Sequence, residues 1–300
     1  MLAIVIPYFK LFFFEKTLQS LADQTNKNFK VYIGNDNSLE NPEELLNNYK
    51  NKINFKYKKF EINLGGTSLV KQWDRCIELV EDEEWIMILG DDDYLENTVI
   101  ESWYKAYNIF VNKSYVIRFA SIVIDEQKGI LSKKYEHPLW EKATESYYRN
   151  FKNLTRSSLS EYIFSKKMYK EKGFKKYPLA WCSDDQAWLD FSNNKPIFTI
   201  NDAVLYIRIS DLSISGKDNN YLTKLKSLNL FYKNNIENRL NEYPKELQLH
   251  FLKYYEIYLK MDKTLESKDW FFLLKKYLSV FSFIPFLKFI RRFLIYKTKL

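Results

Sequence analysis

The sequence is poor in the residues that build disulfide frameworks and zinc sites. Its 300 residues include two cysteines, Cys76 and Cys182, and two histidines, His137 and His250. Two cysteines this far apart in the sequence cannot form the disulfide framework of a small secreted protein, and neither has a Cys or His partner at zinc-ligand spacing. The lone histidines give no support to Ser-His-Asp or Cys-His catalysis. We therefore expect a reducing compartment and chemistry that depends on other side chains.

Long apolar runs and phosphate-loop glycines are also missing. The longest uncharged run near the C-terminus, residues 277–287, is eleven residues long and contains Pro285. A membrane-spanning helix needs roughly 20 apolar residues, so this run is too short. The N-terminus has no basic stretch before its few apolar residues, which favours a first strand over a signal peptide. Gly65-Gly66 is not followed by Gly-Lys-Ser/Thr, so it is not a phosphate loop.

Charge is unevenly distributed along the chain. The net charge is +8, and residues 263–300 hold nine Lys/Arg against two Asp/Glu, so the preceding residues are nearly neutral. A nucleic-acid-binding protein spreads basic residues over its body and interleaves them with aromatic residues, so we expect no nucleic-acid partner. The composition is 46% hydrophobic and 18% aromatic, which is enough for a sizeable folded core.

Periodicity in the first ninety residues predicts alternating strands and helices. Residues 2–7, 29–33, 53–60 and 85–89 have strand patterns, and amphipathic helical patterns lie between them. This order predicts an α/β fold, a mainly parallel sheet with helices on both faces. We expect this domain to cover residues 1–215, with a boundary at Ser213–Gly216, and a helical extension to cover residues 216–300.

Three polar turns follow predicted strands, at residues 34–38, 63–67 and 90–93. Because the carboxyl ends of parallel strands share one edge of a sheet, these turns should meet on one rim, where such sheets bind ligands. Asp91–Asp93 is the sharpest feature, since adjacent carboxylates repel unless a cation or helix-terminal amides offset their charge. We favour a Mg²⁺ or Mn²⁺ site there. The alternative is an acidic turn that caps a helix starting near Asn97.

Several ordered motifs resemble the family 2 glycosyltransferases, inverting enzymes of the GT-A fold, over about residues 1–210. The motifs are a first strand at Ile4–Tyr8, Leu18-Gln19-Ser20-Leu21 with Gln24-Thr25, Asn35-Asp36-Asn37-Ser38, Asn63-Leu64-Gly65 and Asp91–Asp93. Three positions depart from the family pattern. Asn35 and Gly90 stand where an acid is usual, and Asn37 replaces a turn glycine.

The resemblance implies roles for individual residues. It implies that Asp36 contacts the nucleotide base, Asp91 the ribose, and Asp92 a divalent cation, with Asp93 a second or alternate metal ligand. By the same likeness the donor site includes Pro7, Tyr8, Asn63 and Gly65. Lys71 and Arg208 are candidate pyrophosphate contacts, although Lys71 is equally consistent with a solvated surface lysine.

An inverting transferase of this kind also needs a general base for the acceptor hydroxyl. The resemblance places it at Ser183-Asp184-Asp185-Gln186, and we favour Asp185 over Asp184. Trp181 or Trp188 could offer a flat surface to a sugar ring. The alternative is purely structural, because Ser183 and Gln186 have the spacing of a helix capping box.

The basic C-terminal segment is rich in aromatic residues and has no acid after Asp269. We favour a pair of amphipathic helices lying in a membrane interface over a hairpin that closes on the catalytic domain or a second subunit. We therefore expect a metal-dependent glycosyltransferase of the hexosyl type. It would use a nucleotide diphosphate sugar and a glycan or lipid-linked acceptor, in surface polysaccharide synthesis at the cytoplasmic membrane face. The alternatives are a catalytically silent glycan-binding scaffold and a sugar nucleotidyltransferase.

Overall fold

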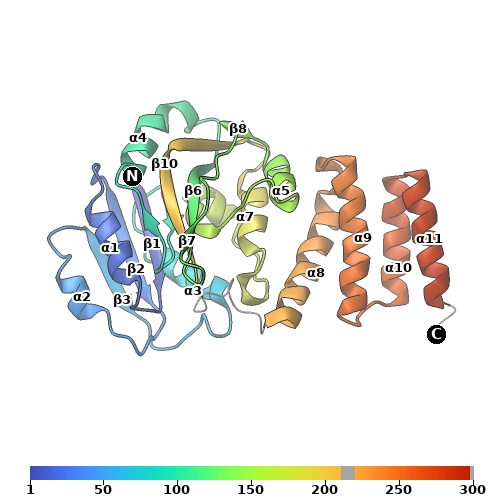
Figure 1. Ribbon diagram of the computed structural model, residues 1–300, viewed down its shortest axis with the longest axis horizontal. Coiled ribbons are helices and arrows are strands. Elements are labelled where there is room, and N and C mark those ends of the chain that lie inside the picture. The colour runs from blue at the N-terminus through green and yellow to red at the C-terminus, as the bar shows by residue number, and fades with distance from the viewer. Residues whose placement is uncertain (211–219, 298–300) are drawn as a thin grey trace. The chain divides into compact units, whose positions relative to one another are not determined.

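The computed structural model describes residues 1–210 and 220–297 (Figure 1). The chain divides into two compact units, Met1–Asp218 and Asn219–Leu300. The boundary expected at Ser213–Gly216 lies outside the described residues.

The first unit is built on one mixed sheet of ten strands. Its strands lie in the order β3 (Phe55–Lys59), β2 (Phe29–Asn35), β1 (Leu2–Tyr8), β4 (Trp85–Ile88), β9 (Tyr162–Ser165), β6 (Val116–Asp125), β10 (Ile197–Ile209) and β5 (Tyr94–Leu95), with β7 (Ile130–Leu131) paired to β6 and β8 (Trp140–Glu141) paired to β10. The first four are parallel to one another, and β9 runs antiparallel between β4 and β6. The prediction of a mainly parallel sheet is confirmed.

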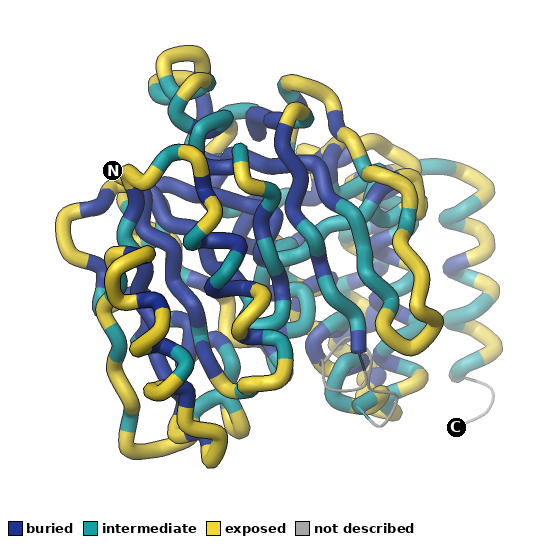
Figure 2. The backbone as a smooth tube through the Cα atoms, turned by 60° about the vertical axis from the view of Figure 1, so that its left-hand side comes forward, coloured by how far each residue is buried: buried dark blue, intermediate teal, exposed yellow. Residues whose placement is uncertain are grey.

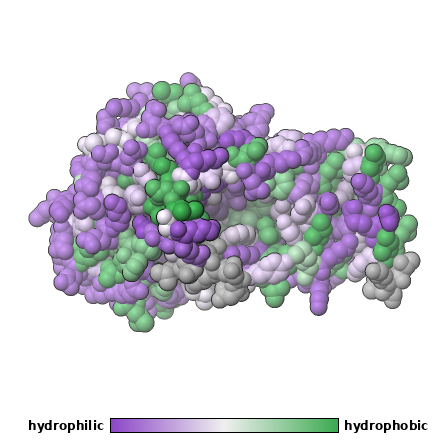
Figure 3. Space-filling view, in the orientation of Figure 1, coloured by the Kyte–Doolittle hydropathy of each residue, from purple (hydrophilic) through white to green (hydrophobic). Residues whose placement is uncertain are grey.

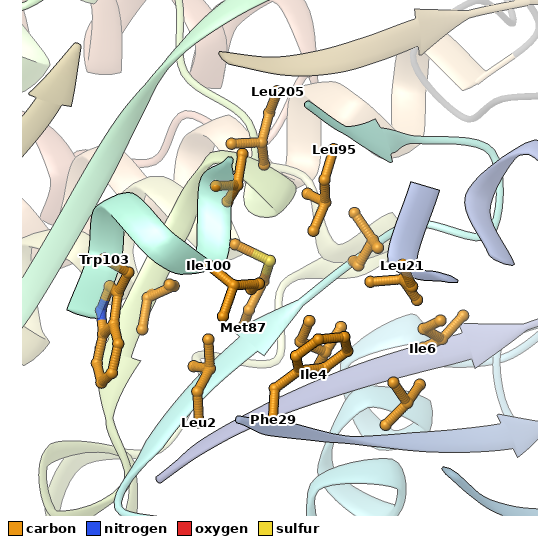
Figure 4. Packing of buried hydrophobic residues seen from close by; sticks show 14 of the residues in the cluster. Leu2, Ile4, Ile6, Leu21, Phe29, Met87, Leu95, Ile100, Trp103 and Leu205 are labelled. Carbon is orange, nitrogen blue, oxygen red and sulfur yellow. The ribbon is translucent and has the colours of Figure 1, made fainter. Parts of the chain in front are cut away.

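Helices cover both faces of this sheet, because side chains of buried parallel strands alternate between two cores. Ile4 and Ile6 of β1 pack in one core with residues of α1 (Phe14–Ala22) and α4 (Val99–Phe110), whereas Ala3 and Val5 pack in the other with residues of α3 (Leu69–Ile77), α6 (Lys166–Lys172) and α7 (Ser183–Phe191). Figure 4 shows the first core, and Figure 2 shows the buried strands within exposed loops. The helices of this unit are α1 (Phe14–Ala22), α2 (Glu43–Asn47), α3 (Leu69–Ile77), α4 (Val99–Phe110), α5 (Ala143–Phe151), α6 (Lys166–Lys172) and α7 (Ser183–Phe191), with short 3-10 turns η1 (Leu159–Glu161) and η2 (Pro178–Ala180).

The second unit is helical, with α8 (Tyr221–Asn238), the 3-10 turn η4 (Leu240–Glu242), α9 (Lys245–Met261), α10 (Ser267–Ser279) and α11 (Phe283–Lys297). The expected helix break near Pro244 is present, since Pro244 caps α9. Trp270 of α10 packs against Phe289, Phe293 and Tyr296 of α11. The basic tail therefore forms half of a helical unit with its own core. Among the described residues, no helix combines the length and apolarity that crossing a membrane requires.

Candidate active site

The acidic turn at the end of β4 is joined to the loop that follows β1. The carboxylate of Asp91 accepts the backbone N–H groups of Phe9 (2.7 Å) and Lys10 (2.8 Å). Thr17 of α1 donates its hydroxyl to the backbone carbonyls of Asp91 and Asp93. Burial nevertheless raises the pKa of Asp91 to about 6. Asp91 thus fixes the β1 loop on the rim where the predicted ribose contact would lie.

Asp93 is buried and both of its carboxylate oxygens are engaged within the protein. Oδ2 accepts the hydroxyl of Ser160 in η1, and Oδ1 accepts the backbone N–H of Arg208 at 2.8 Å. The Arg208 guanidinium donates from Nε to the carbonyl of Asp92, pairs with Glu126 at 2.5 Å, and lies 3.9 Å from the Phe13 ring centre. Arg208 therefore lies beside the acidic turn and holds its backbone, while its charge is shared with Glu126.

Asp92 is the member of the turn whose carboxylate accepts no hydrogen bond from another of the described residues. Burial, followed by repulsion from Asp93 and Asp91, raises the pKa of Asp92 to about 8. A group of this kind gains most from a nearby cation, because ionisation is unfavourable without one. Within residues 1–210 and 220–297 there is no cluster of three or more His, Cys, Asp or Glu side chains arranged to hold a metal ion.

The helix-capping alternative for this turn is wrong. Strand β5 lies between the turn and α4, whose N-cap is Thr98, and the carboxylates of Asp91 and Asp93 accept hydrogen bonds from other parts of the chain. None of the three aspartates is therefore the N-cap of α4.

Asp36, expected at the nucleotide base, joins β2 to the turn at residues 63–67. Its two oxygens accept the backbone N–H groups of Leu64 (2.7 Å) and Gly65 (2.8 Å). Arg75 of α3 forms an ion pair with the same carboxylate and stacks over the Phe60 ring. A Cβ on Gly65 would lie 2.5 Å from Asp36 Oδ2, so only glycine fits there. Two of the three polar turns are therefore bonded directly to each other.

Four other predicted donor residues lie on or near this edge. Pro7 pairs in register with Gly34, and Tyr8 is buried and donates its hydroxyl to the carbonyl of Glu40. Asn63 is exposed and accepts the N–H of Gly66. Lys71 is exposed on the first turn of α3, and no hydrogen bond or ion pair joins it to another described residue.

Asp184 and Asp185 lie in the first turn of α7 and are partly exposed. Burial and the charge of Asp184 raise the pKa of Asp185 well above its ordinary value, and burial raises that of Asp184 to about 6. Such a carboxylate has the proton affinity that a general base requires. The chain enters α7 through left-handed residues, Leu179, Ala180 and Cys182, each with φ between 55° and 65°. Backbone strain of this kind is concentrated at functional sites.

The predicted capping box at this helix is wrong. Cys182 is the N-cap, the buried hydroxyl of Ser183 has no hydrogen-bond partner, and Gln186 instead donates to Asp190. Trp188 stacks on Tyr162 in the core at a ring distance of 4.1 Å, which leaves the half-exposed Trp181 as the tryptophan that a ligand could reach. The Ser183–Gln186 capping box is thus absent from α7.

Arg156 connects the two groups of carboxylates, and the sequence did not indicate it. Its guanidinium pairs with buried Glu161 and donates to the hydroxyl of Ser121 at 3.2 Å. Burial lowers the pKa of Arg156, while the charges of Asp93 and Asp184 act in the opposite direction. Arg156 therefore lies near both the acidic turn and the α7 acids. Its segment, residues 126–160, has no clear periodicity, so pattern analysis could not place it.

Comparison with known proteins identifies the family and the fold. The family model described as Glycosyl transferase family 2 matches residues 3–178. No curated protein matches the chain.

Solved structures of TarS from S. aureus have a similar fold. TarS 1–349 in complex with UDP-GlcNAc superposes with a TM-score of 0.65 at 15% identity, over 93% of this chain and 80% of that chain. The complex with UDP gives 0.62 at 16% identity over the same shares. Against a further TarS structure the TM-score is 0.62, over 95% of this chain and half of that chain. These likenesses confirm the fold expected from the sequence, a GT-A-like sheet flanked by helices with a C-terminal helical part.

Proposed function

The chain belongs to glycosyl transferase family 2, and from this premise we propose that it transfers a sugar from a nucleoside diphosphate sugar to a hydroxyl of a glycan or lipid-linked acceptor, with inversion. The observation that carries the proposal is that Arg156 interacts electrostatically with Asp93 of the acidic turn and with Asp184 of α7. Transfer with inversion needs a site that stabilises the leaving diphosphate and, opposite it, a base. Family membership argues against a nucleotidyltransferase, and the raised pKa values of Asp92 and Asp185 argue against a silent scaffold.

The residues present fit a divalent cation at Asp92. Its carboxylate supplies hard oxygen ligands that no other described residue occupies, and two neighbouring carboxylates add negative charge. Mg²⁺ and Mn²⁺ commonly bind through one or two carboxylates together with phosphate oxygens. When bound, such an ion would neutralise charge that develops on the leaving diphosphate. Asp93, whose oxygens accept Ser160 and Arg208, would mainly position the turn.

The donor would lie along the rim formed by β1, β2 and the turn at 63–67. Asp36 holds this turn, and its bonds to Leu64 and Gly65 shape the surface that faces the base. Asp91 would orient the ribose while it retains the β1 loop. Arg208, and less directly Lys71, would supply positive charge near the diphosphate.

Asp185 would act as the base. It would take the proton from the acceptor hydroxyl while that oxygen bonds to the sugar carbon, and the carbon–diphosphate bond would break on the opposite face. Asp184 raises the proton affinity of Asp185 by charge repulsion. Arg156 would keep the pair close to the acidic turn.

We place the enzyme at the cytoplasmic face of the membrane, in surface polysaccharide synthesis. The support is the surface of α10 and α11, which exposes apolar residues beside cations (Figure 3). The most exposed are Phe271 at 63%, Phe283 at 64% and Ile284 at 63%. Apolar side chains with basic residues suit an anionic lipid surface, and a lipid-linked acceptor would be presented there.

The test of the base compares Asp185→Asn with Asp184→Asn. UDP-GlcNAc is the first donor to try, with Mn²⁺ present, because a similar fold binds it. Asp185→Asn should bind UDP as the wild type does yet lose transfer by roughly 10²–10⁴-fold, the usual contribution of a general base. Asp184→Asn should lose less. Retained transfer in Asp185→Asn would move the role of base to another residue, whereas loss of UDP binding in both variants would indicate a folding defect.

A further inference from the structure

A groove in the first unit adjoins the acidic turn but is not part of the donor rim. Its volume is about 660 Å³, and α1, β5, the β6–β7 hairpin and β10 line it. Arg208 belongs both to this groove and to the acidic turn, since its backbone N–H bonds to Asp93. A molecule bound in the groove would therefore extend toward the reacting centre.

Flat apolar side chains form much of the groove wall. Phe12 is 77% exposed and packs edge-on against Phe13, so its own ring remains available. Tyr94 stacks on Tyr206 at 4.6 Å, which holds its ring in place. Leu131 of the hairpin is 63% exposed, and Figure 3 shows an apolar patch on the face where β7 lies. Exposed aromatic residues that neighbouring side chains hold in place are costly to leave in water unless something binds them.

The charged residues of the groove balance one another. Glu126 pairs with Arg208, and among the described residues that line the groove the other two ionised ones are Glu15 and Lys16. The groove thus has two negative and two positive groups. A polyphosphate acceptor would find no excess of positive charge among these residues, and a hydrocarbon chain would have to desolvate four charged groups. A neutral saccharide suits both features, because it has apolar C–H faces and hydroxyl groups that bond to acids, amides and ammonium groups.

We propose that this groove is a binding subsite for the neutral saccharide part of the acceptor, with Phe12 as the ring on which a sugar stacks. The proposal rests on the glycosyltransferase function proposed above and names the chemical class of its acceptor. Glu126 and Lys16 would bond to sugar hydroxyls while Arg208 keeps its bonds to the acidic turn.

The test uses the full chain and three neutral probes, lactose, cellobiose and N,N′-diacetylchitobiose. Saturation-transfer NMR should show transfer to the ring protons of at least one probe. Phe12→Ala should weaken that binding about tenfold, the loss expected from one stacked aromatic contact. Ile109→Ala is the matched control, because Ile109 is 50% exposed on α4 and does not line the groove. It should bind the probe as the wild type does.

Three outcomes would overturn the proposal. The first is that none of the three sugars receives saturation transfer, and the second is that Phe12→Ala binds the sugar as well as the wild type does. UDP binding is measured by calorimetry on the same samples. If the wild type fails to bind the sugar but still binds UDP, the result contradicts the groove proposal and leaves the transferase function standing. A wild type that binds no UDP would instead contradict the proposed transferase function. Glycerol 3-phosphate that displaces the sugar would show an anionic site and would also overturn the proposal.

Discussion

The three adjacent aspartates lie in three different environments, and these differences indicate a separate role for each residue. Asp91 accepts two backbone N–H groups, Asp93 accepts the Ser160 hydroxyl and the Arg208 backbone N–H, and the Asp92 carboxylate accepts no hydrogen bond from another described residue. A sequence pattern could locate the acidic turn, because repulsion among carboxylates needs a compensating charge. It could not divide the roles, because the partners of Asp93 come from positions 160 and 208, far along the chain.

The raised pKa of Asp92 makes stability depend on pH. Its pKa is about 8 in the folded chain and near the ordinary value of about 4 when unfolded, so between these values the folded state binds the extra proton. Stability should therefore fall as pH rises from 5 to 8 without divalent metal, by on the order of 1 kcal/mol per pKa unit. Asp92→Asn should remove this part of the decline. Urea unfolding of both proteins at pH 5 and pH 8, with EDTA present, measures this fall in unfolding free energy.

The exposed Asp202 supplies the control, since Asp202→Asn should leave the pH dependence as in the wild type. Added Mn²⁺ should restore wild-type stability more at pH 8 than at pH 5, because metal and proton compete for one carboxylate. An identical pH dependence in wild type and Asp92→Asn would show that Asp92 ionises normally in the folded chain.

At the scale of elements, the active-site rim depends on turns that bond to each other. The sequence placed the turns at 34–38, 63–67 and 90–93 on one edge, because parallel strands end together. Left-handed Asn37 also agrees with the tolerance of Asn for that conformation. The segment that contributes Arg156 and Ser160 could not be predicted, because short strands and 3-10 turns have no long hydrophobic period. Its structure is fixed by bonds to distant residues.

The turn at 63–67 offers a test of this dependence. Gly65→Ala would place a Cβ 2.5 Å from Asp36 Oδ2 and force the carboxylate away from the Leu64 and Gly65 amides. We expect a loss of 1–3 kcal/mol in unfolding free energy, roughly the cost of a disrupted buried network, and weaker UDP binding. Gly66→Ala is the matched control for the unfolding free energy, because its Cβ would meet the exposed Asn63 side chain and not the buried Asp36 carboxylate. Calorimetry and urea unfolding should separate the two variants; equal behaviour would contradict a role for the Asp36 bonds.

At the scale of the whole molecule, charge and apolar exposure are concentrated in the second unit. The sequence indicated a basic, aromatic-rich tail, but it could not distinguish cations that serve the helical core from cations that face solvent. Arg292 forms an ion pair with buried Glu256 at 2.8 Å and reaches Tyr277, whereas adjacent Arg291 is exposed. Of these two neighbouring arginines, Arg292 therefore stabilises the helical core and Arg291 faces solvent, because successive residues of a helix point in different directions.

This difference provides a sharp test of membrane binding. The wild-type chain should float with vesicles that contain phosphatidylglycerol and not with pure phosphatidylcholine. Arg291→Gln should weaken that binding about fivefold, since one cation near an anionic surface contributes about 1 kcal/mol. Phe283→Ser should also weaken it, and neither change should lower the unfolding temperature.

Arg292→Gln is expected to lower stability and to leave vesicle binding nearly unchanged. It would leave Lys260 as the ion-pair partner of Glu256 among the described residues and so destabilise the helical unit, because removing one member of a buried pair costs several kcal/mol. Binding by the fraction that remains folded should stay close to wild type. Ile109→Ser, on the first unit, controls for general loss of surface apolarity. If phosphatidylglycerol vesicles fail to carry the wild type, or carry Arg291→Gln and Phe283→Ser equally well, then the exposed face of α10 and α11 binds something other than a lipid surface.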